Sequence, residues 1–97
     1  DMAKGAVAAL DKANISHGVG KDVIVMGFDC NSWALEELLN QNWNYDGQCN
    51  PYQASYIEDV IKKLESGEKI DEKTIIMDEK GFDATTITQD DVDQFGI

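Results

Sequence analysis

The sequence contains no arginine, since all eight of its basic residues are lysines, against nineteen acidic residues. The formal net charge is therefore −11 (8 − 19). Nucleic-acid-binding proteins use clustered lysine and arginine to neutralise phosphates, so this composition argues against a nucleic-acid partner. An anionic membrane surface would repel the chain for the same reason.

Long apolar runs, metal-ligand patterns and phosphate loops are also missing. No stretch of about 18 apolar residues predicts a membrane-spanning helix, and no signal peptide opens the sequence. Cys30 and Cys49 are too far apart for a CxxC pair and His17 is the one histidine, so we expect no metal site. The patterns GxGxxG, GxxxxGK and GxSxG are absent, and we expect no cofactor. The two cysteines allow one disulfide or two buried thiols.

What the sequence does contain is the composition of a globular chain. Its 97 residues allow one small domain or a piece of a larger one. Apolar residues make up 42% and eight glycines raise that share to about half, which favours a folded chain over a disordered one.

Apolar periodicity predicts alternating helices and strands. We expect helices at residues 2–14, from Asn31 or Ser32 onward, at 51–66 and from Thr88 to about Phe95, and strands at 22–28, 48–49 and 73–77. Asn50-Pro51 begins the third helix and Gly67 ends it, while Thr88 and Asp91 resemble a capping box. This order indicates an α/β fold with a parallel sheet and right-handed crossovers.

Asp29 follows the most distinct predicted strand, the apolar run DVIVMGF. A strand that is apolar on both faces belongs inside a parallel sheet covered by helices, and ligands bind beyond the carboxyl ends of such strands. Asp29 is therefore either a helix-capping or loop-bonding residue, or a carboxylate that accepts hydrogen bonds from the vicinal hydroxyls of a sugar.

Two tryptophans accompany this strand end. Trp33 fits the apolar stripe of its helix, with Leu35, Leu38 and Leu39, so we expect it in the core. Trp43 lies in the polar loop 40–47, where it either fills the core or is exposed to a ligand. His17, on a polar loop with no nucleophile near it in sequence, is expected to be a solvated surface residue.

Several stretches then point to a family when taken in order: DMAKGAVAALDKA at residues 1–13, DVIVMGFD at 22–29, NPYQASYIEDVIKKLESGEKI at 50–70, and the tail TTITQDDVDQFGI. Together they resemble the carboxyl-terminal third of the ribose/galactose-type periplasmic sugar-binding proteins. The family's Met-Ala-x-Gly-Ala, Gly-Phe-Asp and Asn-Pro-Tyr-x-x-x-Tyr motifs match residues 2–6, 27–29 and 50–56. The similarity covers nearly the whole chain.

This resemblance implies a type I periplasmic binding protein fold, whose two lobes close on a sugar and deliver it to the permease of an ABC transporter. It implies binding without catalysis, in the periplasm or on a cell-surface lipoprotein. Asp29 corresponds to the family's acceptor of sugar hydroxyls. Cys49 stands where the family usually has Gln or Asn, so Gln48 becomes the candidate for a second polar contact.

The resemblance also implies an incomplete fold. Residues 1–49 would belong to the carboxyl-terminal lobe, residues 50–77 to the hinge crossing and the amino-terminal lobe, and residues 78–97 to a returning tail. It places Cys30 and Cys49 at neighbouring ends by the cleft, from which we predict a disulfide between them. For the isolated chain there are two alternatives: its segments rearrange into one compact α/β unit, or two copies exchange elements across the hinge near Cys49–Pro51. We expect a dimer, and no sugar binding, because one cleft wall is missing.

Two other functions share these features. The effector-binding core of a LacI-type transcription regulator has the same fold, but such cores normally have a proline-rich stretch that NWNYDGQCNP lacks. A small α/β enzyme using Asp29 is the third possibility, which no nucleophile–base pair supports.

Overall fold

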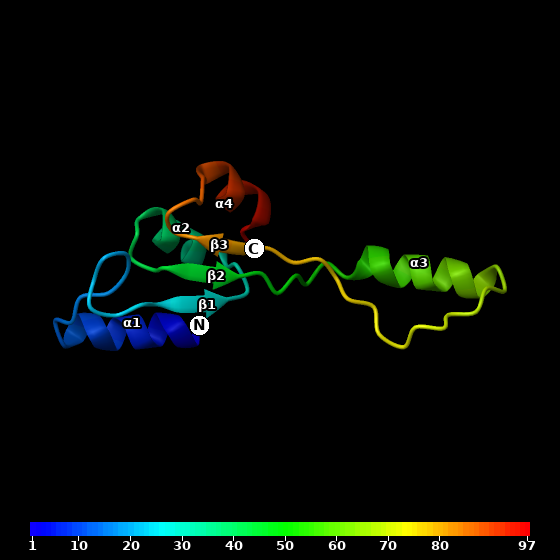
Figure 1. The fold of residues 1–97 in the computed structure, drawn as a ribbon, viewed down its shortest axis with the longest axis horizontal. Coiled ribbons are helices and arrows are strands. Elements are labelled where there is room, and N and C mark those ends of the chain that lie inside the picture. The colour runs from blue at the N-terminus through cyan, green and yellow to red at the C-terminus, as the bar shows by residue number, and fades with distance from the viewer.

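The computed structural model describes all 97 residues, which form an α/β body and a projecting arm (Figure 1). The body contains every helix and strand except α3, which lies in the arm. The molecule is elongated as a result, with principal-axis extents of 61 × 24 × 17 Å. The elements in chain order are α1 (Met2–Lys12), β1 (Met26–Phe28), α2 (Ser32–Leu39), β2 (Tyr45–Gly47), α3 (Ala54–Glu65), β3 (Gly81–Asp83) and α4 (Gln89–Phe95).

The body is built on a three-stranded sheet in the order β1-β2-β3. β1 and β2 are parallel and are joined through α2, whereas β2 and β3 are antiparallel. The predicted α/β class is confirmed, but the prediction of a wholly parallel sheet is wrong. The start of α1, the carboxyl ends of β1 and β2 and the chain's C-terminus all lie at the end of the body from which the arm leaves (Figure 1).

The helices lie close to their predicted positions because local signals specify them. Thr88 and Asp91 form the predicted capping box of α4, and Gly67 has the positive φ, +81°, expected after α3. The start of α3 is three residues later than predicted. The Asn50 side chain accepts a hydrogen bond from the N–H of Tyr52 at 2.8 Å, which makes a turn instead of a helix cap.

The predicted strand at residues 22–28 is reduced to Met26–Phe28, on the edge of the sheet. Val25 and Gly27 are buried, whereas Ile24, Met26 and Phe28 are 64–71% exposed. The expectation that helices cover both faces of this strand is therefore wrong for this chain. One face is packed, and the other carries apolar side chains without a cover.

Two other strands differ from the prediction. The short strand expected at residues 48–49 lies at Tyr45–Gly47, and residues 73–77 form no strand. The third strand is Gly81–Asp83, where the sequence predicted no strand. Residues 73–77 run along the arm, where no other strand is available to pair with them, while Gly81–Asp83 meets the free edge of β2 (Figure 1).

The core lies between the sheet, α2 and α4. Leu35 and Leu38, predicted as part of the buried stripe, are fully buried, and Trp33 and Leu39 pack partly against them. Phe82 of β3 and Phe95 of α4 bring their ring centroids to 5.4 Å. The remaining buried apolar members of this cluster are Val25, Cys30, Ala34, Trp43, Ala84 and Val92.

The arm, residues 50–77, buries almost nothing. α3 has no buried residue, and its predicted apolar stripe is present but uncovered. An open groove of about 250 Å³ runs along this stripe, lined by Gln53, Tyr56, Ile57, Val60, Ile61, Ile75 and Met77. No helix in the structure combines the length and the apolar character needed to cross a bilayer.

Candidate functional site

Asp29 directly follows β1, at the carboxyl end of the strand as predicted. Its exposed side chain lines a pocket of about 170 Å³, which we call the strand-end pocket. Its N–H donates to the carbonyl of Gly47 at 2.8 Å, which holds the residue against the end of β2. The other lining residues are Asp1, Met2, Ala3, Met26, Gly27, Phe28, Trp33, Trp43 and Asp46.

A second carboxylate, Asp46, lies in the wall of the same pocket and was not singled out from the sequence. Its side chain is only 1% exposed. One oxygen, Oδ1, accepts a hydrogen bond from the N–H of Cys30 at 2.9 Å, and Oδ2 has no partner. Burial raises the pKa of this carboxyl because it penalises the charged form. The residue was missed because residues 40–47 read as a polar loop, in which an aspartate is ordinary.

Of the two alternatives left open for Trp43, the structure shows the one in which it fills the core. It is 2% exposed and packs edge-on against Trp33, with ring centroids 5.7 Å apart. Trp43 lies between α2 and β2, and the pairing of β2 with β1 places its side chain in the core. Both tryptophans still line the strand-end pocket, so an aromatic wall stands beside Asp29.

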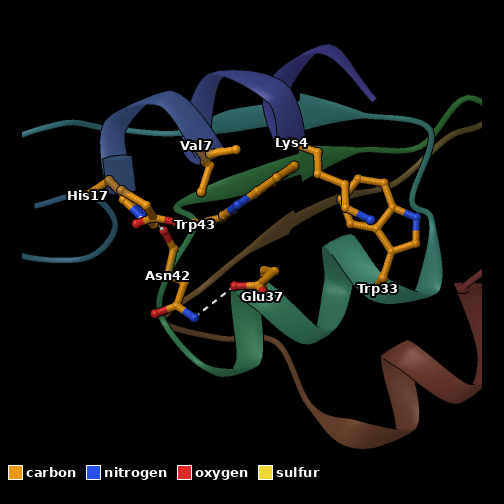
Figure 2. A pocket seen from close by; sticks show the side chains of 9 residues that line it. Lys4, Val7, His17, Trp33, Glu37, Asn42 and Trp43 are labelled. Atoms are coloured by element: carbon orange, nitrogen blue, oxygen red, sulfur yellow. Dashed lines mark hydrogen bonds and ion pairs between the residues drawn. The ribbon is translucent and has the colours of Figure 1, made fainter. Parts of the chain in front are cut away.

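The two tryptophans also line a larger pocket of about 410 Å³ between α1 and α2 (Figure 2). Lys4 from α1 lies over the Trp33 ring, with Nζ 4.5 Å from the centroid. At the other end, Asn42 donates from its amide to Glu37 at 2.7 Å. The tryptophan pair therefore forms a wall common to the two pockets.

His17 is part of this network and is not the solvated surface residue that was expected. Its side chain is 11% exposed, with Nδ1 2.8 Å from the carbonyl oxygen of Asn42 and Nε2 2.9 Å from Oδ1 of Asp11. Both partners are acceptors, so only the protonated imidazolium can donate to both. The hydrogen bond to Asn42, followed by that to Asp11, raises the pKa of His17 above its ordinary value of 6.5.

This geometry predicts a pH-dependent contribution of His17 to stability. Because the folded-state pKa is raised, the contribution is complete below about pH 6.5 and is lost as pH rises through the folded pKa. We expect the difference in unfolding free energy between wild type and His17→Gln to be larger at about pH 5 than at about pH 8.5. Urea denaturation at both pH values measures it. Asp11→Asn should shrink the same difference, and a difference that is independent of pH would contradict the prediction.

Gln48, the predicted second polar contact, is not among the residues of the strand-end pocket. Its N–H donates to the carbonyl of Lys80 at 2.8 Å, and its side-chain Oε1 accepts from the N–H of Lys80 at 3.1 Å. The structure thus places Asp29 and Trp43 in one pocket and bonds Gln48 to Lys80, the residue before β3. A ligand-binding role for Gln48 remains a prediction.

The predicted disulfide is absent, because Cys30 and Cys49 are free thiols. Cys30 is fully buried at the start of α2, whereas Cys49 follows β2 and is exposed. Desolvation, with the nearby charge of Asp46, raises the pKa of Cys30 to about 12. No group of three or more His, Cys, Asp or Glu side chains is placed to hold a metal ion.

The two thiols should therefore differ sharply in reactivity. Alkylation proceeds through the thiolate, which Cys30 neither forms readily nor exposes. We expect iodoacetamide to modify Cys49 in the native chain and Cys30 at least about 100-fold more slowly, through opening of the structure. Mass spectrometry after unfolding without reductant should then show two alkylated cysteines. A disulfide-linked species in that experiment would contradict the structure.

Comparisons with known proteins give structural matches but no family. No protein-family model matches the chain, and no curated protein matches it. A crystal structure from Mycobacterium smegmatis matches with a TM-score of 0.74 and 25% sequence identity, over 87% of this chain and 27% of that one. A crystal structure from Mycobacterium smegmatis in complex with β-D-fucofuranose matches with a TM-score of 0.69 and 27% identity, over 88% of this chain and 27% of that one.

These matches agree with the α/β architecture of the chain. The chain spans 27% of the length of both neighbours. The neighbour complexed with fucofuranose binds a sugar.

Proposed function

We propose that this chain forms one wall of the sugar-binding cleft of a larger solute-binding protein. In this proposal the protein is extracytoplasmic and passes its sugar to the permease of an ABC transporter. The α/β body belongs to one lobe, and the arm formed by residues 50–77 belongs to the hinge and the other lobe. The binding site is the strand-end pocket.

The observation that carries the proposal is the placement of Asp29. Its carboxylate lies at the carboxyl end of a parallel strand, on the wall of a pocket that also contains two tryptophans. A carboxylate that accepts from two hydroxyls beside an aromatic wall is the chemistry that sugar recognition requires. The structural neighbour complexed with β-D-fucofuranose supports a sugar as the ligand.

The size of the pocket supports a site shared with a second wall. At about 170 Å³ it is smaller than the ~300–1,000 Å³ typical of complete small-molecule sites.

Calorimetric titration of the longer protein that carries this chain tests the proposal. The probe is methyl β-D-fucofuranoside, which is locked in the ring form found in the structural neighbour, and pyranosides serve as the comparison. We expect saturable binding of at least one of these sugars by the longer protein and none by the isolated 97-residue chain. Absence of binding to every sugar by the longer protein would overturn the proposal.

We further infer that the isolated chain self-associates through the groove on α3. Apolar side chains there are about half exposed, Ile57 at 54% and Ile61 at 49%, so burying the rest of each contributes about half of the ~1.5–3 kcal/mol that full burial gives. We expect light scattering to show a dimer, and Ile61→Lys to restore the monomer. Glu65→Gln changes the net charge equally but leaves the groove intact, so it should remain dimeric. A wild-type chain that stays monomeric at high concentration would contradict this inference.

A further inference from the structure

Asp46 is unusual because a buried carboxyl oxygen is left without a partner. The Oδ2 atom has essentially no contact with solvent, and no lysine or histidine pairs with the group. Leaving such a group unsatisfied destabilises a fold, so its presence calls for a specific reason. Desolvation raises its pKa, which agrees with the lack of a cationic partner. A hydrogen bond from the N–H of Cys30 to Oδ1 ties Asp46 to the segment after β1.

That hydrogen bond ends on a strained turn. Asp29 and Cys30 have φ values of 98° and 55°, so two consecutive residues other than glycine occupy a region that side chains disfavour. Such backbone persists only where its surroundings hold it in place. Three hydrogen bonds do so here: Asp29 N–H to Gly47 O at 2.8 Å, Cys30 N–H to Asp46 Oδ1 at 2.9 Å, and Ile97 N–H to Cys30 O at 3.0 Å. We call residues 29–30 with these three bonds the strand-end turn.

We propose that Asp46 is a positioning residue, whose buried carboxyl holds the strand-end turn so that Asp29 projects into the strand-end pocket. Of the three bonds, only this one comes from a side chain, so it is the one that a substitution can remove cleanly. The inference rests on the proposed function, because it concerns the affinity of that same site. Asp46 affects the ligand only by orienting Asp29.

The burial of Asp46 indicates that it positions the strand-end turn and does not contact the ligand directly. Since Oδ2 is shielded from solvent, a ligand hydroxyl cannot reach it without rearrangement of the pocket wall. The wall is tight at this point: a Cβ on Gly27 would lie 2.5 Å from Oδ2 and 2.8 Å from the Trp43 ring. Oδ1, in contrast, is already used by the turn. The role of Asp46 in the turn therefore depends on the acceptor oxygen Oδ1, which an amide oxygen can replace.

Two substitutions of Asp46 distinguish the contribution of its acceptor oxygen from that of its charge. Asp46→Asn keeps an acceptor oxygen and loses the charge, whereas Asp46→Ala loses both. In the longer protein, titrated with methyl β-D-fucofuranoside, we expect Asp46→Ala to weaken binding by about tenfold or more and Asp46→Asn to recover most of that loss. In an Asp29→Ala background, Asp46→Ala should weaken binding little further, because it acts through Asp29. Equal losses in both Asp46 variants, or additive losses with Asp29→Ala, would overturn the proposal.

A measurement without sugar keeps this test independent of the proposed function. In the 97-residue chain, hydrogen exchange of the Cys30 amide reports directly on the strand-end turn. We expect exchange to become about tenfold faster or more in Asp46→Ala and to stay near wild type in Asp46→Asn, relative to amides in the core of α2. If no sugar binds but this pattern appears, the proposed function fails and the role in the turn stands. Unchanged exchange in Asp46→Ala would overturn the positioning role whatever the sugar result.

Discussion

Replacing Asp29 with alanine should weaken sugar binding by the longer protein about a hundredfold or more. Hydrogen bonds to a charged group contribute about 1.5–3 kcal/mol each, and a carboxylate that holds two vicinal hydroxyls loses both. The side chain makes no hydrogen bond within the chain, and it lies exposed on the pocket wall. The loss should therefore appear in calorimetric affinity and should far exceed any change in stability.

The backbone conformation of Asp29 determines which control variants are needed. With φ at 98°, alanine adds local strain that aspartate and asparagine tolerate better. Asp29→Asn therefore keeps the melting temperature near wild type while still losing the charge-assisted bonds. Asp71→Ala removes the same charge from an exposed site in the arm and should leave affinity unchanged. Wild-type affinity in both Asp29 variants would remove this residue from the site.

The second large effect is expected at Gly18, in the loop between α1 and β1. The residue is buried with φ at 102°, and an added Cβ would overlap the backbone carbonyl oxygens of Gln41 and Asn42. The strain of a positive φ costs about 1–2 kcal/mol, and the overlap with backbone, which cannot rotate away, adds about 1–3 kcal/mol. We expect Gly18→Ala to lose about 3 kcal/mol or more, which lowers the melting temperature by about 12 °C or more.

Gly20 provides the matched control, because it shares the positive φ but not the crowding. Its φ is 69°, and no atom lies within 4 Å of the position a Cβ would take. Gly20→Ala should lose only about 1 kcal/mol, or about 4–8 °C in a chain of this length. Thermal denaturation followed by circular dichroism gives both values. If the two variants melt together, the close approach of Gly18 to residues 41–42 does not contribute to stability.

The residues behind these predictions differ in how far the sequence alone identifies them. Asp29 can be identified from the sequence, because its position depends on one local event, the end of an apolar strand. Asp46 and Gly18 depend on contacts between distant segments. The hydrogen bond from Cys30 to Asp46 spans 16 residues, and Gly18 meets residues 41–42 across an entire strand and helix. No local pattern carries that information.

The sequence by itself determined the helices and the end of β1. Each helix signal involves residues only a few positions apart, so it does not depend on the rest of the fold. These signals are the stripe of Leu35 and Leu38, the Thr88–Asp91 capping box and the glycine after α3. The tertiary structure alone decided which extended segments pair. The apolar run at residues 73–77 has strand composition but no partner along the arm, while Gly81–Asp83 becomes β3 because the edge of β2 is open beside it. Burial was decided in the same way: Trp43, Asp46 and Cys30 come together only when α2 returns the chain to β2, since backbone pairing and desolvation depend on neighbours that are distant in sequence.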